Sequence, residues 1–233
     1  QDRVGASFNH EDPSFTLNEV VKLGLDAHAD FIGELSGNAN KELAIEVSLT
    51  EIEGRWAGVE LDIGTYKDKY YKLRSTDDVS QLLEDDSVAL STMKASRFYL
   101  SFEEKITFWE NSLSTISEVI EMCLTVQRQW MYLESIFKAA DIQRQLPNEY
   151  KDFDKINKMW LDLMRKTNAD PTALKQATAP KLLENLQKIS GSSCAKTQAR
   201  LQRMPGDRLL ALASRLGQPR SLALELALLF HQF

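Results

Sequence analysis

The side chains best suited to chemistry in this 233-residue chain are few, and the histidines come first: His10, His28 and His231. His28 has Asp26 and Asp30 nearby, and an imidazole with two carboxylates could bind a metal ion. Residues two apart on a helix do not share a face, so these side chains would point in different directions. We therefore expect a half-buried helix histidine at position 28 and predict no metal site.

Two pairs of adjacent acids could be imagined as general acid–base groups. They are Asp85-Asp86 and Glu103-Glu104. Both pairs fall inside expected helices, and solvated helix faces explain them better than a catalytic site does. We therefore predict that all four carboxylates face water.

Motifs that hold phosphates or catalytic metals are missing from the sequence. It has no Gly-x-x-x-x-Gly-Lys-Ser/Thr, Gly-x-Gly-x-x-Gly, His-Glu-x-x-His or zinc-type cysteine spacing. Cys123 lies on an apolar stripe and should pack inertly, and with Cys194 it fits a reducing compartment. The net charge of −6 does not favour nucleic acid, and no apolar run reaches the ~18 residues of a membrane span. We predict no catalytic, cofactor-binding or metal-binding residue, and no nucleic-acid or membrane partner.

Tryptophans are a further candidate, because aromatic side chains can line a ligand cage. They are Trp56, Trp109, Trp130 and Trp160. Each falls at the helical spacing of an apolar stripe in its own segment, so we interpret all four as core residues. The segment from Trp130 to Phe137 is apolar on more than one side, which predicts a helix contacted from two directions.

Long helices must position these residues, because residues 65–146 form a run of 82 without glycine or proline. Glycine and proline usually end elements and shape ligand loops, so their absence predicts continuous rods. The longest rod should reach Ala140 before Pro147 stops it, and at 1.5 Å per residue it would be roughly 60 Å long. Its apolar seam alternates spacings of four and three: Phe102, Ile106, Trp109, Leu113, Ile116, Ile120, Cys123, Gln127 and Trp130.

Two helices are expected before this rod. A capping box formed by Thr16 and Glu19 should start the first, which carries apolar residues at helical spacing up to Leu35. Residues 36–38, a Ser-Gly-Asn sequence, should break it. A second helix is expected from near Asn40, with one stripe that holds Ile45, Leu49, Ile52 and Trp56.

A single β-hairpin is expected between these helices and the rod. Val59, Leu61 and Ile63 alternate with polar residues, as in a half-buried strand, and residues 66–69 can turn into a return strand over 70–74. An isolated hairpin is marginal in water, so it should lie on a helical surface. Further helices are expected from Ser75, around residues 153–163 and around residues 182–186. The predicted fold class is therefore mainly α: an elongated array of long helices with one small hairpin.

The two ends differ from the middle. The chain begins with Gln1 and has no signal-peptide pattern, so we expect an internal part of a longer protein, with residues 1–13 as a disordered lead-in. Residues 1–189 carry 22 basic and 32 acidic side chains, a net of −10, whereas residues 190–233 carry six basic and two acidic, a net of +4. We expect residues 190–233 to form an atypical, unpacked tail from read-through, a frame change or unusual splicing, or else a divergent but genuine helical end.

Several uncommon strings stand out along the chain. The main one is Gln127-Arg128-Gln129-Trp130-Met131-Tyr132-Leu133-Glu134-Ser135-Ile136-Phe137, then Asp141-Ile142 and Gln145-Leu146-Pro147. Upstream are Glu60-Leu61-Asp62, Tyr66-Lys67-Asp68, Ser91-Thr92-Met93-Lys94-Ala95-Ser96, Trp109-Glu110 and Val119-Ile120-Glu121-Met122. Taken in their order along the chain, over about residues 14–189, these strings closely resemble the dynein heavy chain at the linker that precedes its motor ring, and the strings that begin at Ser91 and Val119 lean towards axonemal members. The family's Phe-Pro-Arg-Phe-Tyr-Phe string does not follow Ile189.

The resemblance implies a fragment of an ATP-driven microtubule motor. Residues 14–57 would be the end of the tail and residues 58–189 the N-terminal part of the linker, a lever that bends and straightens across a ring of AAA modules. ATP and Mg would be bound in that ring and not here, so this chain is expected to be no enzyme. Expected partners are the ring of the same heavy chain, other dynein subunits and, through the whole motor, microtubules, in the cytoskeleton of a ciliary or flagellar axoneme or alternatively the cytoplasm. The alternative function is a non-motor helical scaffold or tethering module.

Because the phosphate-binding motifs are missing, we predict that the isolated chain neither binds nor hydrolyses ATP. Calorimetric titration with Mg-ATP should show no binding. A dissociation constant below about 100 µM, roughly −5.5 kcal/mol, would contradict this prediction.

Overall fold

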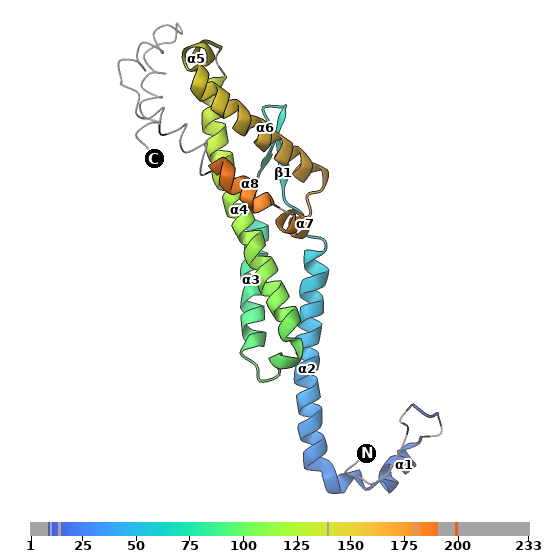
Figure 1. The fold of residues 1–233 in the computed structure, drawn as a ribbon. Helices are drawn as coiled ribbons and strands as arrows, with labels where there is room; N and C mark the ends of the chain where they lie inside the picture. The colour runs from blue at the N-terminus through green and yellow to red at the C-terminus, as the bar shows by residue number, and fades with distance from the viewer. Residues whose placement is uncertain are drawn as a thin grey trace.

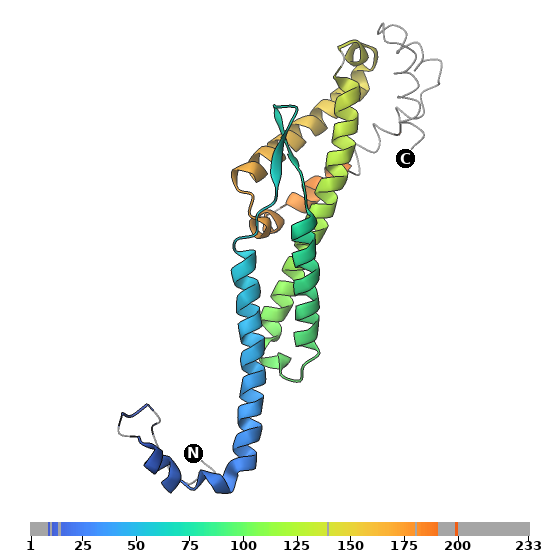
Figure 2. The same cartoon turned by 180° about the vertical axis from the view of Figure 1, so that it is seen from behind.

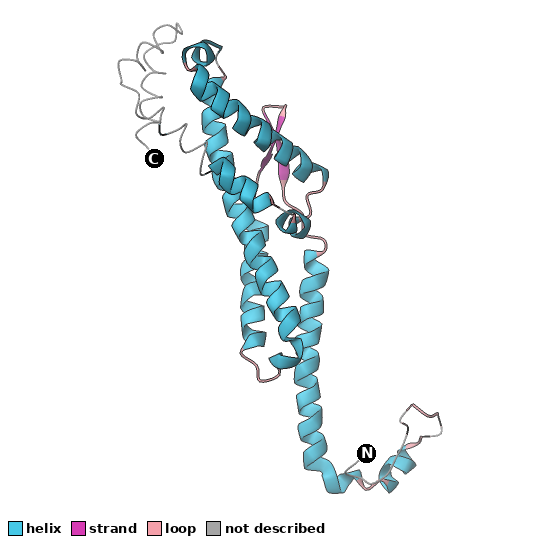
Figure 3. Ribbon diagram, in the orientation of Figure 1, coloured by secondary structure: helices cyan, strands magenta, loops and turns pink. Residues whose placement is uncertain are grey.

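A computed structural model describes residues 9, 11–13, 15–138, 140–179, 181–190 and 199. Most of the expected lead-in and nearly all of the expected tail lie outside these residues, so both stay predictions. The described part is an elongated array of helices with one two-stranded hairpin, which confirms the predicted fold class (Figures 1 and 3). The elements are α1 (Leu17–Lys22), η1 (Leu25–His28), α2 (Ala29–Trp56), β1 (Ile63–Tyr66), β2 (Tyr70–Leu73), α3 (Asp77–Lys94), η2 (Tyr99–Phe102), α4 (Glu103–Phe137), α5 (Ala140–Gln145), α6 (Pro147–Ala169), α7 (Ala173–Thr178) and α8 (Leu182–Lys188).

α1 begins where the sequence predicts but without the predicted capping box. The side chain of Thr16 makes no cap bond, and the Glu19 amide instead donates to the Thr16 carbonyl at 2.9 Å. The carboxylate of Glu19 binds Lys22, three residues on, at 2.7 Å. The helix is then interrupted at Gly24, whose φ of 61° lies in the left-handed region that glycine adopts without strain.

α2 runs unbroken through residues 36–38, so the predicted break there and the predicted helix start near Asn40 are wrong. A glycine inside a helix costs only about 1 kcal/mol, which neighbouring contacts can offset. One such contact is the hydrogen bond from Arg97 Nη2 to Asn38 Oδ1, at 3.0 Å, which ties α2 to the segment before η2. The predicted core stripe of α2 is confirmed, since its buried residues are Ile45, Leu49, Ile52 and Trp56.

The hairpin forms as an antiparallel pair with Ile63 opposite Leu73. The open end of the hairpin is held together by Arg74, just after β2, and Asp62, just before β1. The Nε and Nη2 atoms of Arg74 donate to Asp62 Oδ1 at 3.0 and 2.8 Å. This arrangement needs Gly64, because a Cβ at that position would lie 2.3 Å from the Arg74 side chain. Figure 2 shows the hairpin layered against α6 and α4, the helical surface that a lone hairpin requires.

The first strand is shorter than the alternation in the sequence predicts. Residues 59–61 pair with the segment before α7 and not with β2. The Leu61 amide donates to the Pro171 carbonyl at 2.8 Å, and the Ala173 amide donates to the Val59 carbonyl at 2.9 Å. Period-two alternation therefore identified extended backbone correctly but could not tell that the segment has two different partners.

α4 is the longest element, and its 35 residues correspond to about 52 Å at 1.5 Å per residue. It ends at Phe137, slightly earlier than predicted. The predicted seam is confirmed, with every member buried except the half-buried Phe102. α2 and α3 lie along the first half of α4, and α6, α7, α8 and the hairpin lie along the second half (Figures 1 and 2).

The C-terminal helices fold back onto α4. The rod has already ended at Phe137, so Pro147 does not stop it as predicted. Pro147 instead begins α6, where a proline at the first helical position has no amide to leave unbonded. The predicted apolar residues of α6 are buried or half-buried, with Trp160 fully buried. α8 matches the predicted last helix, whereas α7 was not among the predicted helices. The buried core extends to Ile189, directly after α8.

Candidate functional site

The hairpin meets α4 and α6 in a cluster that we call the hairpin junction: Tyr66, Lys67, Tyr70, Leu73, Gln127, Trp130, Glu134, Asn157 and Trp160. The side chain of Gln127 attaches β2 to α4. Its Oε1 accepts from the Leu73 amide at 2.8 Å, and its Nε2 donates to the Leu73 carbonyl at 2.9 Å. A side-chain amide thus replaces the pairing that another strand would give, and it fixes the register of the hairpin on the rod.

Trp130 joins three elements in the same cluster. Its ring meets Tyr66 and Tyr70 edge-on, with centroids 5.8 and 5.5 Å away, and lies 6.1 Å from the ring of Trp160. Its Nε1 donates to Asn157 Oδ1 of α6 at 3.0 Å. The indole is fully buried, so its polar end has a partner as burial requires.

Lys67 and Glu134 bring the turn of the hairpin down onto α4. The ammonium donates to the carboxylate of Glu134, which is buried. Burial opposes the Lys67 charge, but the hydrogen bonds to Glu134 and Tyr66 prevail and raise the pKa of Lys67 above its ordinary value. Lys67 and Asp68 both have positive φ, 53° and 52°, as the tight turn of a hairpin demands. The ion pair therefore holds a turn that non-glycine residues adopt only with strain.

A further buried polar contact, outside the hairpin junction, fastens α2 to α3. Asp86 is 3% exposed and accepts from Trp56 Nε1 at 2.8 Å and from Arg55 Nη2 at 2.5 Å. The prediction that this carboxylate faces water is therefore wrong, because an indole and a guanidinium at the end of α2 replace its hydration. Asp85, Glu103 and Glu104 are exposed as predicted.

The other side chains that could in principle bind a metal or act as a nucleophile have structural surroundings that do not favour either role. His28 is half-buried, as predicted, and Asp26 and Asp30 beside it are exposed. Burial raises the pKa of the Cys123 thiol to about 12, so the thiol stays protonated near neutral pH and is a poor nucleophile. Among the described residues no group of His, Cys, Asp and Glu side chains could hold a metal ion, and no helix is both long and apolar enough to cross a membrane.

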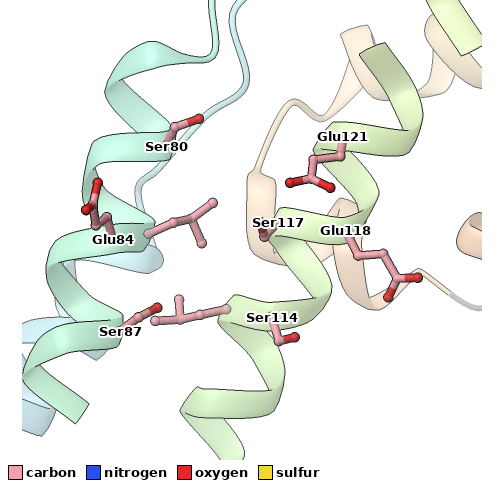
Figure 4. A pocket seen from close by; sticks show the side chains of 9 residues that line it. Ser80, Glu84, Ser87, Ser114, Ser117, Glu118 and Glu121 are labelled. Carbon is pink, nitrogen blue, oxygen red and sulfur yellow. The ribbon is translucent and has the colours of Figure 1, made fainter. Parts of the chain in front are cut away.

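An open groove of about 680 Å³ separates α3 from α4 (Figure 4). Its floor is apolar, formed by Leu83 and Leu113. The rim consists of hydroxyls and carboxylates without a histidine, cysteine or cation, so it supplies neither a nucleophile with a neighbouring base nor a phosphate-binding charge. The rim residues are Ser80, Glu84, Ser87, Ser114, Ser117, Glu118 and Glu121.

Sequence reasoning found the members of the seam but missed the polar contacts that define both sites. Gln127 is a polar residue in an apolar seam, and that irregularity is the signal that could have identified an attachment point. Asp86 gave a similar signal, since its spacing from Val79, Leu83 and Leu90 places it on the buried face of α3. The Lys67–Glu134 pair joins residues 67 apart and had no local signal.

Comparison with known proteins agrees with this architecture. A family profile described as "Dynein heavy chain, N-terminal region 2" matches residues 1–204. The chain belongs to the dynein heavy chain family. The matched residues include the whole hairpin junction.

Individual dynein heavy chains give the same result. "Dynein axonemal heavy chain 2" of Homo sapiens is 52% identical over 187 residues, which are 80% of this chain and 4% of that protein. "Dynein-1-beta heavy chain, flagellar inner arm I1 complex" of Chlamydomonas reinhardtii is 45% identical over 191 residues, 82% of this chain and 4% of that protein. The predicted resemblance to axonemal dynein heavy chains is confirmed, and the chain spans about 4% of the length of these curated relatives.

We predict that Gln127→Leu destabilises this dynein segment by about 2–4 kcal/mol, because it leaves the buried Leu73 amide and carbonyl without their partner. Urea unfolding followed by circular dichroism measures the change. The matched control is Arg128→Leu, an exposed neighbour on the same helix, which should change stability by less than about 0.5 kcal/mol. Equal effects of the two substitutions would contradict the role of Gln127.

Proposed function

We infer that this chain is a mechanical part of a dynein heavy chain: the tail-proximal half of the linker that acts as the lever of an ATP-driven microtubule motor. The observation that carries this proposal is α4, which runs unbroken for 35 residues and contacts α3, α5, α6, α7, α8 and β2. A lever transmits force only if it resists bending, and a continuous helix braced on several sides has no weak point along its length. The division into tail residues 14–57 and linker residues 58–189 is part of the same proposal.

The hairpin favours a lever over the alternative of a plain helical scaffold. A bundle that only tethers other proteins needs no strands, yet here Gln127 and Glu134 use buried polar groups to hold a hairpin against α4. Buried polar contacts are costly unless fully paired, and in return they fix one arrangement of the elements. Such a fixed element suits a part that must meet other surfaces at a defined angle.

The remaining parts of the proposal concern the whole motor. We propose that the chain itself is no enzyme, that it needs no cofactor, and that ATP and Mg act in the AAA ring of the same heavy chain. Its partners would be that ring and other dynein subunits, with microtubules reached through the full-length motor. The names of the relatives, axonemal and flagellar, support a place in the axoneme of cilia or flagella.

Softening α4 in the full-length heavy chain should slow the motor more than it slows ATP turnover. We propose to replace Ser114, Glu118 and Glu121, three exposed residues of α4 on the rim of the groove beside α3, by glycine. Each glycine costs the helix about 1 kcal/mol relative to alanine. Microtubule gliding velocity divided by ATP turnover should fall for the glycine variant.

The matched control carries alanine at the same three positions, so it removes the same side chains but keeps a stiff helix. It should retain the velocity per ATP of the parent motor. Equal behaviour of the glycine and alanine variants, despite measurably lower helix stability in the glycine variant, would refute the lever function.

A further inference from the structure

α2 has a second apolar face that no described part of the chain covers. The helix extends beyond the turn between α3 and α4, so its N-terminal part, before the contact of Asn38 with Arg97, projects away from the body (Figures 1 and 2). Five large apolar side chains of this helix keep much of their surface in water. Phe31 (38% exposed) lies on the side of the buried stripe, and the other four lie away from it: Ile32 (38%), Leu35 (58%), Leu43 (54%) and Val47 (47%). A contiguous exposed apolar surface of this kind marks an interaction site.

These four residues form one stripe. At about 100° per residue they fall within about 120° of one another around α2, with Ala39 between them. The buried stripe, Ile45 to Trp56, lies on a different side of the helix and is already occupied by the body. α2 is therefore built to pack in two directions, and the second direction has the i, i+3, i+4 pattern that another helix recognises.

The net charge of α2 indicates what kind of helix could pack on this stripe. α2 carries six acidic side chains against two basic ones, Lys41 and Arg55, a net of −4. Arg55 is engaged with Asp86. At about 100° per residue, Glu42 lies on one flank of the apolar stripe and Glu51 on the other, and Glu46 lies within the stripe, at an angle between Leu35 and Ala39. A second copy of this chain would bring like charges together across the contact, which is unfavourable.

We propose that the second apolar face of α2 (Ile32, Leu35, Leu43 and Val47) docks a basic amphipathic helix from elsewhere in the same heavy chain. Leucine-type side chains of that helix would cover the stripe, and its lysines or arginines would meet Glu46 within the stripe and Glu42 and Glu51 on its two flanks. The source in the same polypeptide rests on the proposed function, because the relatives are heavy chains of which this segment covers 4%. A helix on the same chain also has a high effective concentration at the face.

Photo-crosslinking in the full-length heavy chain tests the proposal. Benzoyl-phenylalanine replaces Leu43, and mass spectrometry identifies the captured peptide. The matched control places the same probe at Ala44, which is also exposed but lies about 100° around the helix. The Leu43 probe should capture a heavy-chain peptide with net positive charge, and Glu42→Lys with Glu46→Lys should lower its yield about fivefold or more.

Capture of a second copy of this segment, of another polypeptide or of an acidic peptide would overturn the proposal. A yield at Leu43 no higher than at Ala44, or one unchanged by the charge reversals, would also overturn it. Because both probes replace exposed residues, their folding is checked by an unchanged melting temperature. The capture needs only the assembled heavy chain and no movement, so its failure is distinct from a failure of the lever test on α4.

Discussion

The structure depends on the continuity of one helix. α4 presents its seam to the upstream elements over its first half and to the C-terminal helices and the hairpin over its second half. Residues 59–61 join the end of α2 to the segment before α7, and beyond that contact the rod sets the position of the elements on one half relative to those on the other. This is why an uninterrupted run without glycine or proline matters more here than any single reactive side chain.

Three buried polar contacts then decide how the shorter elements are positioned. Gln127 and the Lys67–Glu134 pair fix the hairpin, and Asp86 fixes the end of α2 through Arg55 and Trp56. Apolar packing alone tolerates small shifts of one helix along another. A polar group left unpaired in the interior, by contrast, destabilises the fold by its full desolvation free energy. Each contact therefore specifies register more than it adds stability.

The sequence predicted the rod and the core well, for a clear physical reason. The seam from Ile106 to Trp130 is a periodic signal carried by the helix itself, so no distant partner is needed to see it. Predictions failed where a tertiary contact overrode a local preference. Residues 36–38 stay helical although Gly37 favours a break, and Asp86 is buried because Arg55 and Trp56 happen to end α2 beside it. The pairing of residues 59–61 with the segment before α7 joins parts of the chain over 100 residues apart, which local alternation cannot reveal.

Native-state hydrogen exchange, resolved by residue, tests the central claim that α4 is the rigid spine of this dynein segment. The account predicts that the amides from Ile106 to Leu133, together with that of Leu73, exchange slowest and only through global unfolding, while the first half of α2 exchanges through local opening. If amides in the middle of α4, around Ser114 to Glu121, exchange through local fluctuations as fast as those of the projecting half of α2, α4 is not a rigid element and the account is wrong.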